Sequence, residues 1–346
     1  MSSNPEVTAA RPRAVIFGCA GPTLADDERR FFAGVDPYGF ILFRRNIEDS
    51  EQVRRLARGL RDSVGRPDAP ILIDQEGGRV ARLGPPHWQT LPPARAIGLL
   101  AERDRPAGLR AARASGRVIG AMLADLGIDV ACAPVADLLL PETHGVIGDR
   151  AFSADAELVG ALASAMCSGL RDAGVTPIIK HIPGHGRATV DSHLALPVIA
   201  ATRETLDATD FAAFRAIRDA PWAMVAHCVY QAFDAERPAS TSPVTIETAI
   251  RESIGFAGIL IADDIGMKAL RGGLAENAAA TLSAGCDLTL HCSGDLSEME
   301  AIGPSVPPLT REACRRLANA SEWMTEAVTG FDLDRERALL QGLTTS

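Results

Sequence analysis

Eight short apolar runs recur along the chain, and longer helix-compatible segments separate them. The runs are continuously hydrophobic, which is typical of parallel strands that are buried on both faces. They are AVIFGC (14–19), FILF (40–43), ILID (71–74), DVACAPVAD (129–137), TPIIKH (176–181), AMVAHCVY (223–230), GILIADD (258–264) and DLTLHC (287–292). Alternating strands and helices predict a parallel sheet, and eight such units predict closure into a (β/α)8 TIM barrel.

The segments between the runs are amphipathic and several open on helix-start residues. They cover about 49–64, 107–126, 155–173, 203–219, 245–253, 265–284 and 309–328. Asp49 and Thr202 each stand where an N-cap is expected. We expect the stretch from roughly 75 to 105, which contains two proline pairs, to be a long loop on the active face. Without a low-complexity segment or an interdomain linker, we expect one domain over residues 1–346 with a core of about 14–328.

Composition excludes several classes of protein. The net charge is −9 and no Lys/Arg run resembles a nucleic-acid patch, so we expect no nucleic-acid partner. The seven cysteines include no C-x-x-C pair, which favours a reducing compartment. The sequence shows no signal-peptide pattern and no run of 18 apolar residues. We therefore expect a cytoplasmic monomer with no membrane partner.

Polar residues end six of the eight runs. They are Asp74, Asp137, Lys180-His181, His227, Asp263-Asp264 and His291. The carboxyl ends of all strands in such a barrel meet at one rim, where the active sites of this fold lie. The pattern therefore predicts an enzyme whose site is at that rim.

The segment KHIPGHGRATVDSH (180–193) follows the fifth run. Lys180 and His181 can donate hydrogen bonds to hydroxyls or to an anion. Asp191 can orient His193 for proton transfer, although an isolated D-x-H is more often a turn with an exposed histidine. His185 completes a set of plausible metal ligands, but the proline and glycine in HIPGH forbid the helix that usually presents an H-x-x-x-H pair. We expect no metal or other cofactor, and a structural role for His185.

Two further segments carry candidate site residues. In DQEGGRVARL, the Asp74 carboxylate can accept from paired sugar hydroxyls, and arginines of this turn can donate in a fork. No phosphate-binding glycine loop is present there. In ILIADDIGM, a rim carboxylate is a candidate nucleophile or base. Adjacent residues of a strand point to opposite sides, so we expect only one of Asp263 and Asp264 to face the pocket, with Asp264 capping the next helix as an alternative.

The motifs ILFRRNI, DQEGGRVARL, GDRAFS, KHIPGHGRATVDSHLALP and ADDIGM occur in this order. Together they resemble the family 3 glycoside hydrolases, and most closely the bacterial β-N-acetylhexosaminidases of the NagZ type. The resemblance spans about residues 14 to 292 and implies a single-domain catalytic barrel. Ile182 stands where phenylalanine is usual and Ala262 where serine or threonine is common, and neither departure removes a catalytic group.

The resemblance also implies roles for particular residues. The nucleophile falls on Asp263, the acid/base on His193, and its orienting partner on Asp191. The sugar-binding residues fall on Asp74, Arg82, Arg150, Lys180 and His181. The reaction implied is retaining, exo-acting release of terminal N-acetylglucosamine from a small carbohydrate, with GlcNAc-anhydro-N-acetylmuramic acid peptides of peptidoglycan recycling as the natural substrate.

Other functions remain open at this level. One is a β-N-acetylglucosaminide phosphorylase, because a neutral or cationic acid/base tolerates a phosphate nucleophile better than a carboxylate does. Another is a different β-glycosidase of family 3. A third is a barrel that only binds sugar or metal, against which the presence of Asp263, Asp191 and His193 argues.

Overall fold

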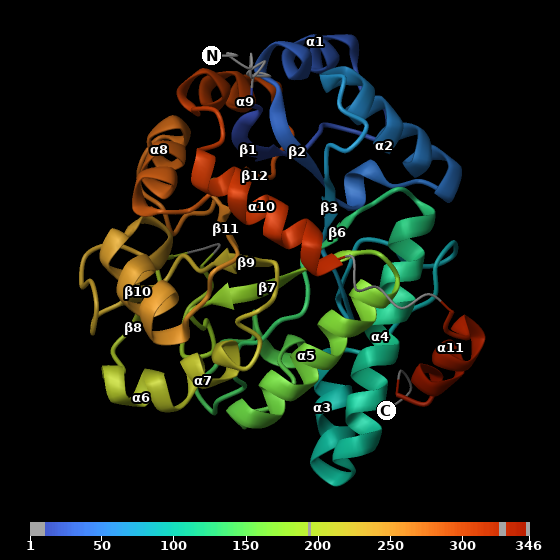
Figure 1. The fold of residues 1–346 in the computed structure, drawn as a ribbon, viewed down its shortest axis with the longest axis vertical. Coiled ribbons are helices and arrows are strands. Elements are labelled where there is room, and N and C mark those ends of the chain that lie inside the picture. The colour runs from blue at the N-terminus through green and yellow to red at the C-terminus, as the bar shows by residue number, and fades with distance from the viewer. Residues whose placement is uncertain (1–10, 193–194, 325–329, 344–346) are drawn as a thin grey trace, which may run out of the picture.

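Eight parallel strands close into a barrel in the computed structural model, which describes residues 11–192, 195–324 and 330–343 (Figure 1). Around the barrel the order is β1-β12-β11-β9-β7-β6-β3-β2, and β2 pairs with β1. The strands are β1 (Arg13–Phe17), β2 (Pro37–Leu42), β3 (Ile71–Ile73), β6 (Val130–Ala131), β7 (Thr176–Ile182), β9 (Trp222–Val225), β11 (Ile259–Asp264) and β12 (Leu288–His291). The predicted single-domain (β/α)8 TIM barrel is therefore confirmed.

Helices surround the barrel in the order that strand–helix alternation requires. They are α1 (Asp26–Val35), α2 (Ser50–Val64), α4 (Arg105–Asp125), α5 (Ala156–Asp172), α6 (Arg203–Ala208), α7 (Asp210–Arg215), the π-helix η4 (Thr245–Ile254), α8 (Leu274–Ala284) and α9 (Leu296–Ile302). Local sequence sets their ends: the Asp49 carboxylate accepts from the backbone N–H of Gln52 at the start of α2, and Gly65 ends that helix at a φ of 63°. No described helix is both long and apolar enough to cross a membrane.

The stretch from 75 to 105 is not the long loop that its prolines suggested. It forms a hairpin of β4 (Gln75–Gly77) and β5 (Val80–Ala81) and the helix α3 (Ala94–Arg103). Gly77 and Gly78 take φ values of 101° and 56°, a backbone that glycine adopts without penalty, and this lets the chain turn back within two residues. The hairpin matters because it lies directly after β3 and carries residues of the site.

Two helix predictions also need correction, and one helix was not predicted. The segment 203–219 is divided at Thr209 into α6 and α7, and the segment 265–284 is helical only from Leu274. Glycines at 266, 272 and 273 precede that helix and favour an irregular backbone there. The unpredicted helix is α1, which lies between the first two barrel strands.

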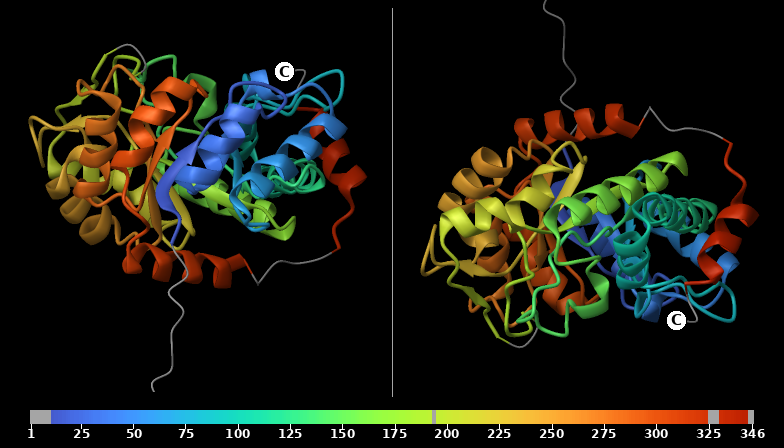
Figure 2. Two further views of the ribbon diagram at one scale, coloured as in Figure 1. Left: turned by 90° about the horizontal axis from the view of Figure 1, so that it is seen from above. Right: turned by 90° about the horizontal axis from the view of Figure 1, so that it is seen from below.

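The two ends of the barrel are built differently. At the amino-terminal end of the strands, Ala14 donates to the carbonyl of Pro307 and Leu309 donates to that of Pro12, which brings α10 (Arg311–Met324) across the barrel (Figures 1 and 2). The carboxyl-terminal end carries loops and a small sheet of β8 (Val198–Ile199) and β10 (Val229–Tyr230). After α10, α11 (Leu333–Gln341) packs beside α4.

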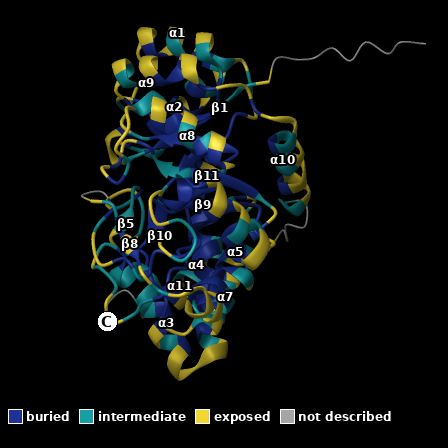
Figure 3. Ribbon diagram, turned by 90° about the vertical axis from the view of Figure 1, so that its left-hand side faces the viewer, coloured by how far each residue is buried: buried dark blue, intermediate teal, exposed yellow. Residues whose placement is uncertain are grey.

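Buried apolar residues of the strands and of the helices around them form one core cluster, and Figure 3 shows buried residues concentrated in the strands. Every residue of β3 and β9 is buried, and so are all but the first of β1, as parallel strands covered on both faces require. The buried polar side chains include several at the carboxyl ends of strands, such as Asp137, Lys180, His181, His227 and His291. The rigid core thus ends, at one rim, in a ring of polar groups.

Candidate active site

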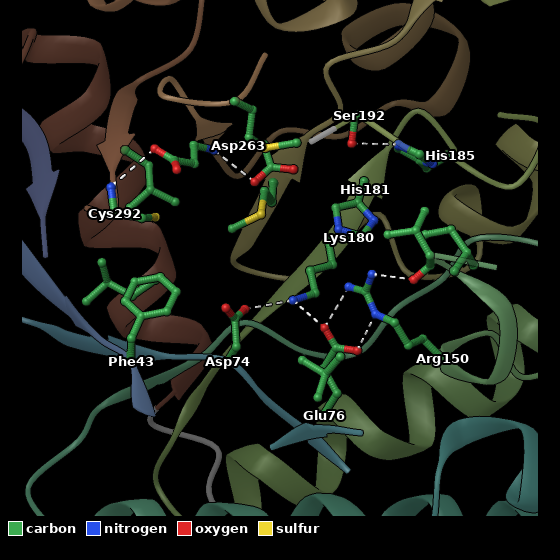
Figure 4. A pocket seen from close by; sticks show the side chains of 18 of the residues that line it. Phe43, Asp74, Glu76, Arg150, Lys180, His181, His185, Ser192, Asp263 and Cys292 are labelled. Carbon is green, nitrogen blue, oxygen red and sulfur yellow. Dashed lines mark hydrogen bonds and ion pairs between the residues drawn. The ribbon is translucent and has the colours of Figure 1, made fainter. Parts of the chain in front are cut away.

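A cavity of about 270 Å³ opens at the carboxyl ends of the barrel strands. Six residues predicted from the sequence to act on or bind substrate line it, namely Asp74, Arg82, Arg150, Lys180, His181 and Asp263. Figure 4 shows Asp263 across the cavity from Glu76 and Arg150, with Lys180 between them. Residues almost 190 positions apart in sequence therefore meet in one site, as the rim of a barrel allows.

The hairpin after β3 positions Arg82 against Asp74. The Gln75 side-chain oxygen accepts from the backbone N–H groups of Arg82 and Leu83 at 2.9 and 3.0 Å, and its amide donates to the Leu83 carbonyl at 3.1 Å. This buried amide fixes the two arms of the turn to each other. Arg82 Nη2 then donates to Asp74 Oδ2 at 2.8 Å.

A chain of charged groups forms one wall of the cavity. Lys180 Nζ contacts Asp74 Oδ1 at 2.9 Å and Glu76 Oε1 at 2.6 Å. Arg150, which lies in the long loop after β6, donates from Nε and Nη2 to the two oxygens of Glu76 at 2.8 Å each (Figure 4). This wall holds several donors in fixed positions, which is what binding a polyhydroxyl ligand requires.

Glu76 was not singled out from the sequence as a site residue. Its position two residues after Asp74 was the signal, because side chains at i and i+2 of an extended chain point to the same side. The partners that give it a role, Lys180 and Arg150, lie 104 and 74 residues along the chain. Only the closed barrel brings them together.

Asp137 is a second residue whose role the sequence did not assign. Its buried carboxylate accepts from the His181 backbone N–H at 3.2 Å and from His185 N–H at 2.6 Å, and it contacts His181 Nδ1 at 2.7 Å. A carboxylate on Nδ1 fixes the orientation of the ring and leaves Nε2 for a ligand. Asp137 ends the fourth apolar run, so its place at the rim could be predicted, but its pairing with His181 and His185 could not.

The loop after β7 returns to the cavity at Ser192. His185 Nε2 and Ser192 Oγ lie 3.2 Å apart, and both side chains are buried at the cavity wall. This contact agrees with the structural role expected for His185. Asp191 is half-buried and precedes Ser192. His193, the predicted acid/base, lies outside the described residues.

Both aspartates at the end of β11 line the cavity, so the expectation that only one would face it is wrong. Asp263 Oδ1 accepts from the Asp264 backbone N–H at 2.8 Å. Asp264 Oδ1 accepts from Gly266 at 3.1 Å and from Cys292 at 3.2 Å. Asp264 is not a helix cap either, because α8 begins after Gly273.

Two histidines that end strands lie behind this aspartate pair. His227 contacts Ser240 Oγ through Nδ1 at 2.6 Å and the Asp264 carbonyl oxygen through Nε2 at 3.0 Å. His291 contacts Ser293 Oγ through Nε2 at 2.9 Å. Burial lowers the pKa of both imidazoles, so the neutral ring is favoured at each position. They support the strand ends rather than lining the cavity.

Opposed effects set the ionisation of the charged wall. Burial alone would raise the pKa of Asp74, but Lys180 and Arg82 hold it well below its usual value. Burial likewise opposes the charged form of Glu76, and Lys180 and Arg150 lower its pKa. For Lys180, burial disfavours the cation, whereas Asp74 and Glu76 raise its pKa. The paired geometry therefore keeps all three groups ionised.

His181, His185, Asp191 and His193 are the residues of the segment 180–193 that could ligate a metal. Among residues 11–192, 195–324 and 330–343, no three His, Cys, Asp or Glu side chains are grouped so that they could hold a metal ion. His181 and His185 instead share the Asp137 carboxylate. These hydrogen bonds fix the backbone of both residues on one buried carboxylate.

A barrel with a rim cavity, a carboxylate on one side and fixed hydrogen-bond donors on the other defines a class of enzyme that acts on polar, hydroxyl-rich substrates. The sequence model described as "Glycosyl hydrolase family 3 N terminal domain" matches residues 25–320. The chain belongs to glycoside hydrolase family 3, within its β-N-acetylhexosaminidase branch.

Individual relatives match over nearly the whole chain. It is 38% identical to a beta-hexosaminidase of Xylella fastidiosa (strain M23) over 286 residues, which are 82% of this chain and 84% of that protein. It is 35% identical to the beta-hexosaminidase of Bordetella pertussis over 323 residues, 91% of each. The crystal structure of NagZ from Neisseria gonorrhoeae with N-trifluoroacetyl-D-glucosamine superposes with a TM-score of 0.87 at 30% identity, covering 98% of this chain and 100% of that one. The family and enzyme class expected from the sequence are confirmed.

Proposed function

We propose that the enzyme is a retaining exo-β-N-acetylglucosaminidase, which releases terminal N-acetylglucosamine through a covalent intermediate. The observation that carries this proposal is that Asp263 faces the wall of Asp74, Lys180 and Arg150 across one cavity of about 270 Å³. A small cavity at the rim suits one terminal sugar rather than the middle of a chain. The sugar bound in the Neisseria NagZ structure supports the same class of ligand.

In the proposed mechanism the wall residues bind and orient the sugar. Asp74 accepts from hydroxyl groups, while Arg82, Arg150, Lys180 and His181 donate to hydroxyl and acetamido oxygens. Asp74 and Lys180 remain ionised because each stabilises the other at 2.9 Å. The sugar is thereby held with its anomeric carbon toward the opposite side of the cavity.

Chemistry then needs one nucleophile and one proton donor. The Asp263 carboxylate attacks the anomeric carbon, and the bond to the leaving oxygen breaks to give a glycosyl-enzyme ester. His193, as an imidazolium oriented by Asp191, gives its proton to the leaving oxygen. The neutral imidazole next takes a proton from water, which attacks the anomeric carbon and frees Asp263. The two displacements together retain the anomeric configuration.

The natural substrate we propose is GlcNAc linked to anhydro-N-acetylmuramic acid peptides, acted on in the cytoplasm during peptidoglycan recycling. The support for this finer step is the resemblance of the sequence motifs to the NagZ type. Incubating the enzyme with purified muropeptides and analysing the products by mass spectrometry tests it. Turnover of aryl N-acetylglucosaminides without cleavage of muropeptides would contradict the natural substrate and leave the reaction class intact.

Trapping the intermediate tests the nucleophile. A 5-fluoro-GlcNAc donor with an activated leaving group should leave a stable adduct on the peptide that contains Asp263, because the fluorine slows both displacements and the leaving group speeds only the first. Asp263→Asn should prevent the adduct and reduce turnover of an aryl β-N-acetylglucosaminide by about 10³-fold or more. An adduct on another residue, or retained turnover, would refute the assignment.

A leaving-group series tests His193. His193→Ala should reduce turnover of substrates with poor leaving groups by about 10²–10⁴-fold, since these need a proton in the transition state. A dinitrophenyl glycoside, whose leaving group departs as an anion, should lose far less kcat/KM, which reports the first displacement and not the later attack of water. Equal losses on both substrates would argue against an acid role.

A further inference from the structure

Glu76 lies in the cavity wall, but the proposed mechanism gives it no task. Its side chain is 6% exposed, and both of its oxygens face cations: Oε1 and Oε2 accept from Arg150 at 2.8 Å, and Oε1 also contacts Lys180 Nζ at 2.6 Å. A buried carboxylate is stable only when it is paired in this way. Glu76 is thus the point at which an arginine and a lysine from different parts of the barrel are joined (Figure 4).

The pairing limits what the two cations can do. Lys180 Nζ has three N–H donors, and Asp74 and Glu76 face two of them. Arg150 uses Nε and one Nη2 hydrogen on Glu76 and donates from Nη1 to the Val146 carbonyl at 3.1 Å. Each cation therefore has only a few N–H groups left, in fixed directions, that can donate to a ligand. Without Glu76, both groups would be free to turn toward any acceptor in the cavity.

The net charge of the cavity wall also depends on Glu76. The connected groups Arg82, Asp74, Lys180, Glu76 and Arg150 carry three positive and two negative charges. Neutralising Glu76 would leave three positive charges against one negative charge in a wall that binds a neutral sugar. Such a wall is a good site for a tetrahedral oxyanion, because guanidinium and ammonium groups are strong phosphate donors.

Building on the proposed function, we propose that Glu76 is a specificity-determining and positioning residue: it offsets the charge of Lys180 and Arg150 so that the cavity accepts a neutral sugar and rejects inorganic anions such as phosphate. Glu76 acts through its two partners and does not itself touch the substrate. The proposal concerns ligand choice, which a residue that only stabilised the fold would not affect.

Competition between a neutral substrate and phosphate tests this inference. Kinetics of an aryl β-N-acetylglucosaminide would be measured with and without inorganic phosphate at constant ionic strength. In Glu76→Gln, which keeps the side-chain shape and removes the charge, KM should rise about 10-fold because an amide N–H faces a cation. The Ki of phosphate should fall by about 10- to 100-fold, since one negative charge near the bound anion is lost.

Two variants separate charge from shape. Glu76→Asp keeps the charge on a shorter side chain and should restore weak phosphate inhibition while KM stays raised. Glu102→Gln is the matched control: Glu102 pairs with both terminal nitrogens of Arg95, at 2.6 and 3.2 Å, outside the cavity. It should leave KM and the phosphate Ki unchanged. A Glu76→Gln enzyme with an unaltered phosphate Ki would overturn the proposal.

The test stays decisive if Glu76→Gln does not fold. The wild-type enzyme should then be inhibited only weakly by phosphate, and strong competitive inhibition would by itself overturn the inference. Calorimetric titration of N-acetylglucosamine and phosphate into folded variants reads ligand choice without turnover. Its result is therefore independent of the fate of Asp263 as nucleophile, so failure of the proposed mechanism and failure of this inference can be told apart.

Discussion

His185 is a buried histidine at the cavity wall, 3% exposed, and its burial should make the free energy of unfolding depend on pH. Burial, followed by the nearby His181, lowers the pKa of His185 from 6.5 to about 4. Between these values the unfolded chain takes up a proton at this residue that the folded chain does not. Stability should therefore fall as pH falls from 6.5 to 4, and the loss should be about 3 kcal/mol at roughly 1.4 kcal/mol per pH unit.

Urea unfolding at several pH values checks this prediction against a variant. His185→Gln has no group that titrates in this window, so its free energy of unfolding should fall less than that of the wild type between pH 6.5 and pH 4.5. The exposed His87 provides the control, because His87→Gln should follow the wild type. Parallel curves for the wild type and His185→Gln would show that His185 takes up its proton in the folded state.

At the residue scale, the sequence was informative where a side chain ends a strand. Asp74, Lys180, His181 and Asp263 were placed at the rim by the strand pattern alone, and the structure brings them to one cavity. Glu76 was missed because the residues with which it pairs, Lys180 and Arg150, are distant in sequence. Strand-end position is a local property, whereas charge pairing depends on which loops meet.

At the element scale, the eight strands were predictable because each is a continuous apolar run, and barrel closure then follows from their number. The segments at the rim were predicted less well. The β4–β5 hairpin is stabilised by the buried Gln75 amide and two glycines with positive φ, not by hydrophobic periodicity. Patterns that report burial cannot detect elements that polar side chains and backbone conformation stabilise.

Two glycines inside helices, Gly116 and Gly59, allow a prediction about how closely the helices pack. In α4, a Cβ on Gly116 would overlap the Met166 carbonyl oxygen of α5, so these helices pack with their backbones close together. In α2, a Cβ on Gly59 would meet nothing closer than Arg29 Nη2 at 4.0 Å. Gly116→Ala should thus destabilise the protein by about 1–3 kcal/mol, whereas Gly59→Ala should stabilise it by about 0.5–1 kcal/mol.

Chemical unfolding of the two variants measures the change in the free energy of unfolding, which should have opposite signs for the same substitution at the two positions. Both glycines lie inside helices, so the helix propensity gained from alanine is shared and only the packing differs. A stabilised Gly116→Ala variant would mean that α4 and α5 can separate at little cost.

At the scale of the whole molecule, the substrate cavity and the contacts of Asp287 lie at opposite ends of the barrel. The cavity lies at the carboxyl ends of the strands, and α10 lies across the amino ends. Just before β12, the Asp287 carboxylate accepts from Leu260 N–H at 3.0 Å and contacts Arg316 Nη1 at 2.8 Å and Arg251 Nη2 at 3.4 Å. This carboxylate joins two strands, η4 and α10, and none of these contacts reaches the cavity.

Asp287 and Asp263 therefore offer a test of that separation, since they are carboxylates on neighbouring strands at opposite ends of the barrel. Asp287→Ala should reduce the free energy of unfolding by about 3 kcal/mol, because two partly buried arginines lose their shared partner. The folded fraction should keep its kcat/KM at 25 °C. Asp287→Asn should be intermediate, since its amide oxygen can still accept from Leu260 N–H.

Asp263→Asn should show the converse, with turnover lost and the free energy of unfolding unchanged or raised. The physical reason is that Asp263 lies beside Asp264, so removing one of two adjacent carboxylates relieves like-charge repulsion. Urea unfolding and steady-state kinetics on the same preparations measure both quantities. If Asp287→Ala lowered kcat/KM of the folded enzyme as strongly as it lowered stability, the two ends would be coupled through β11 and β12, and the cavity would depend on the far end of the barrel for its geometry.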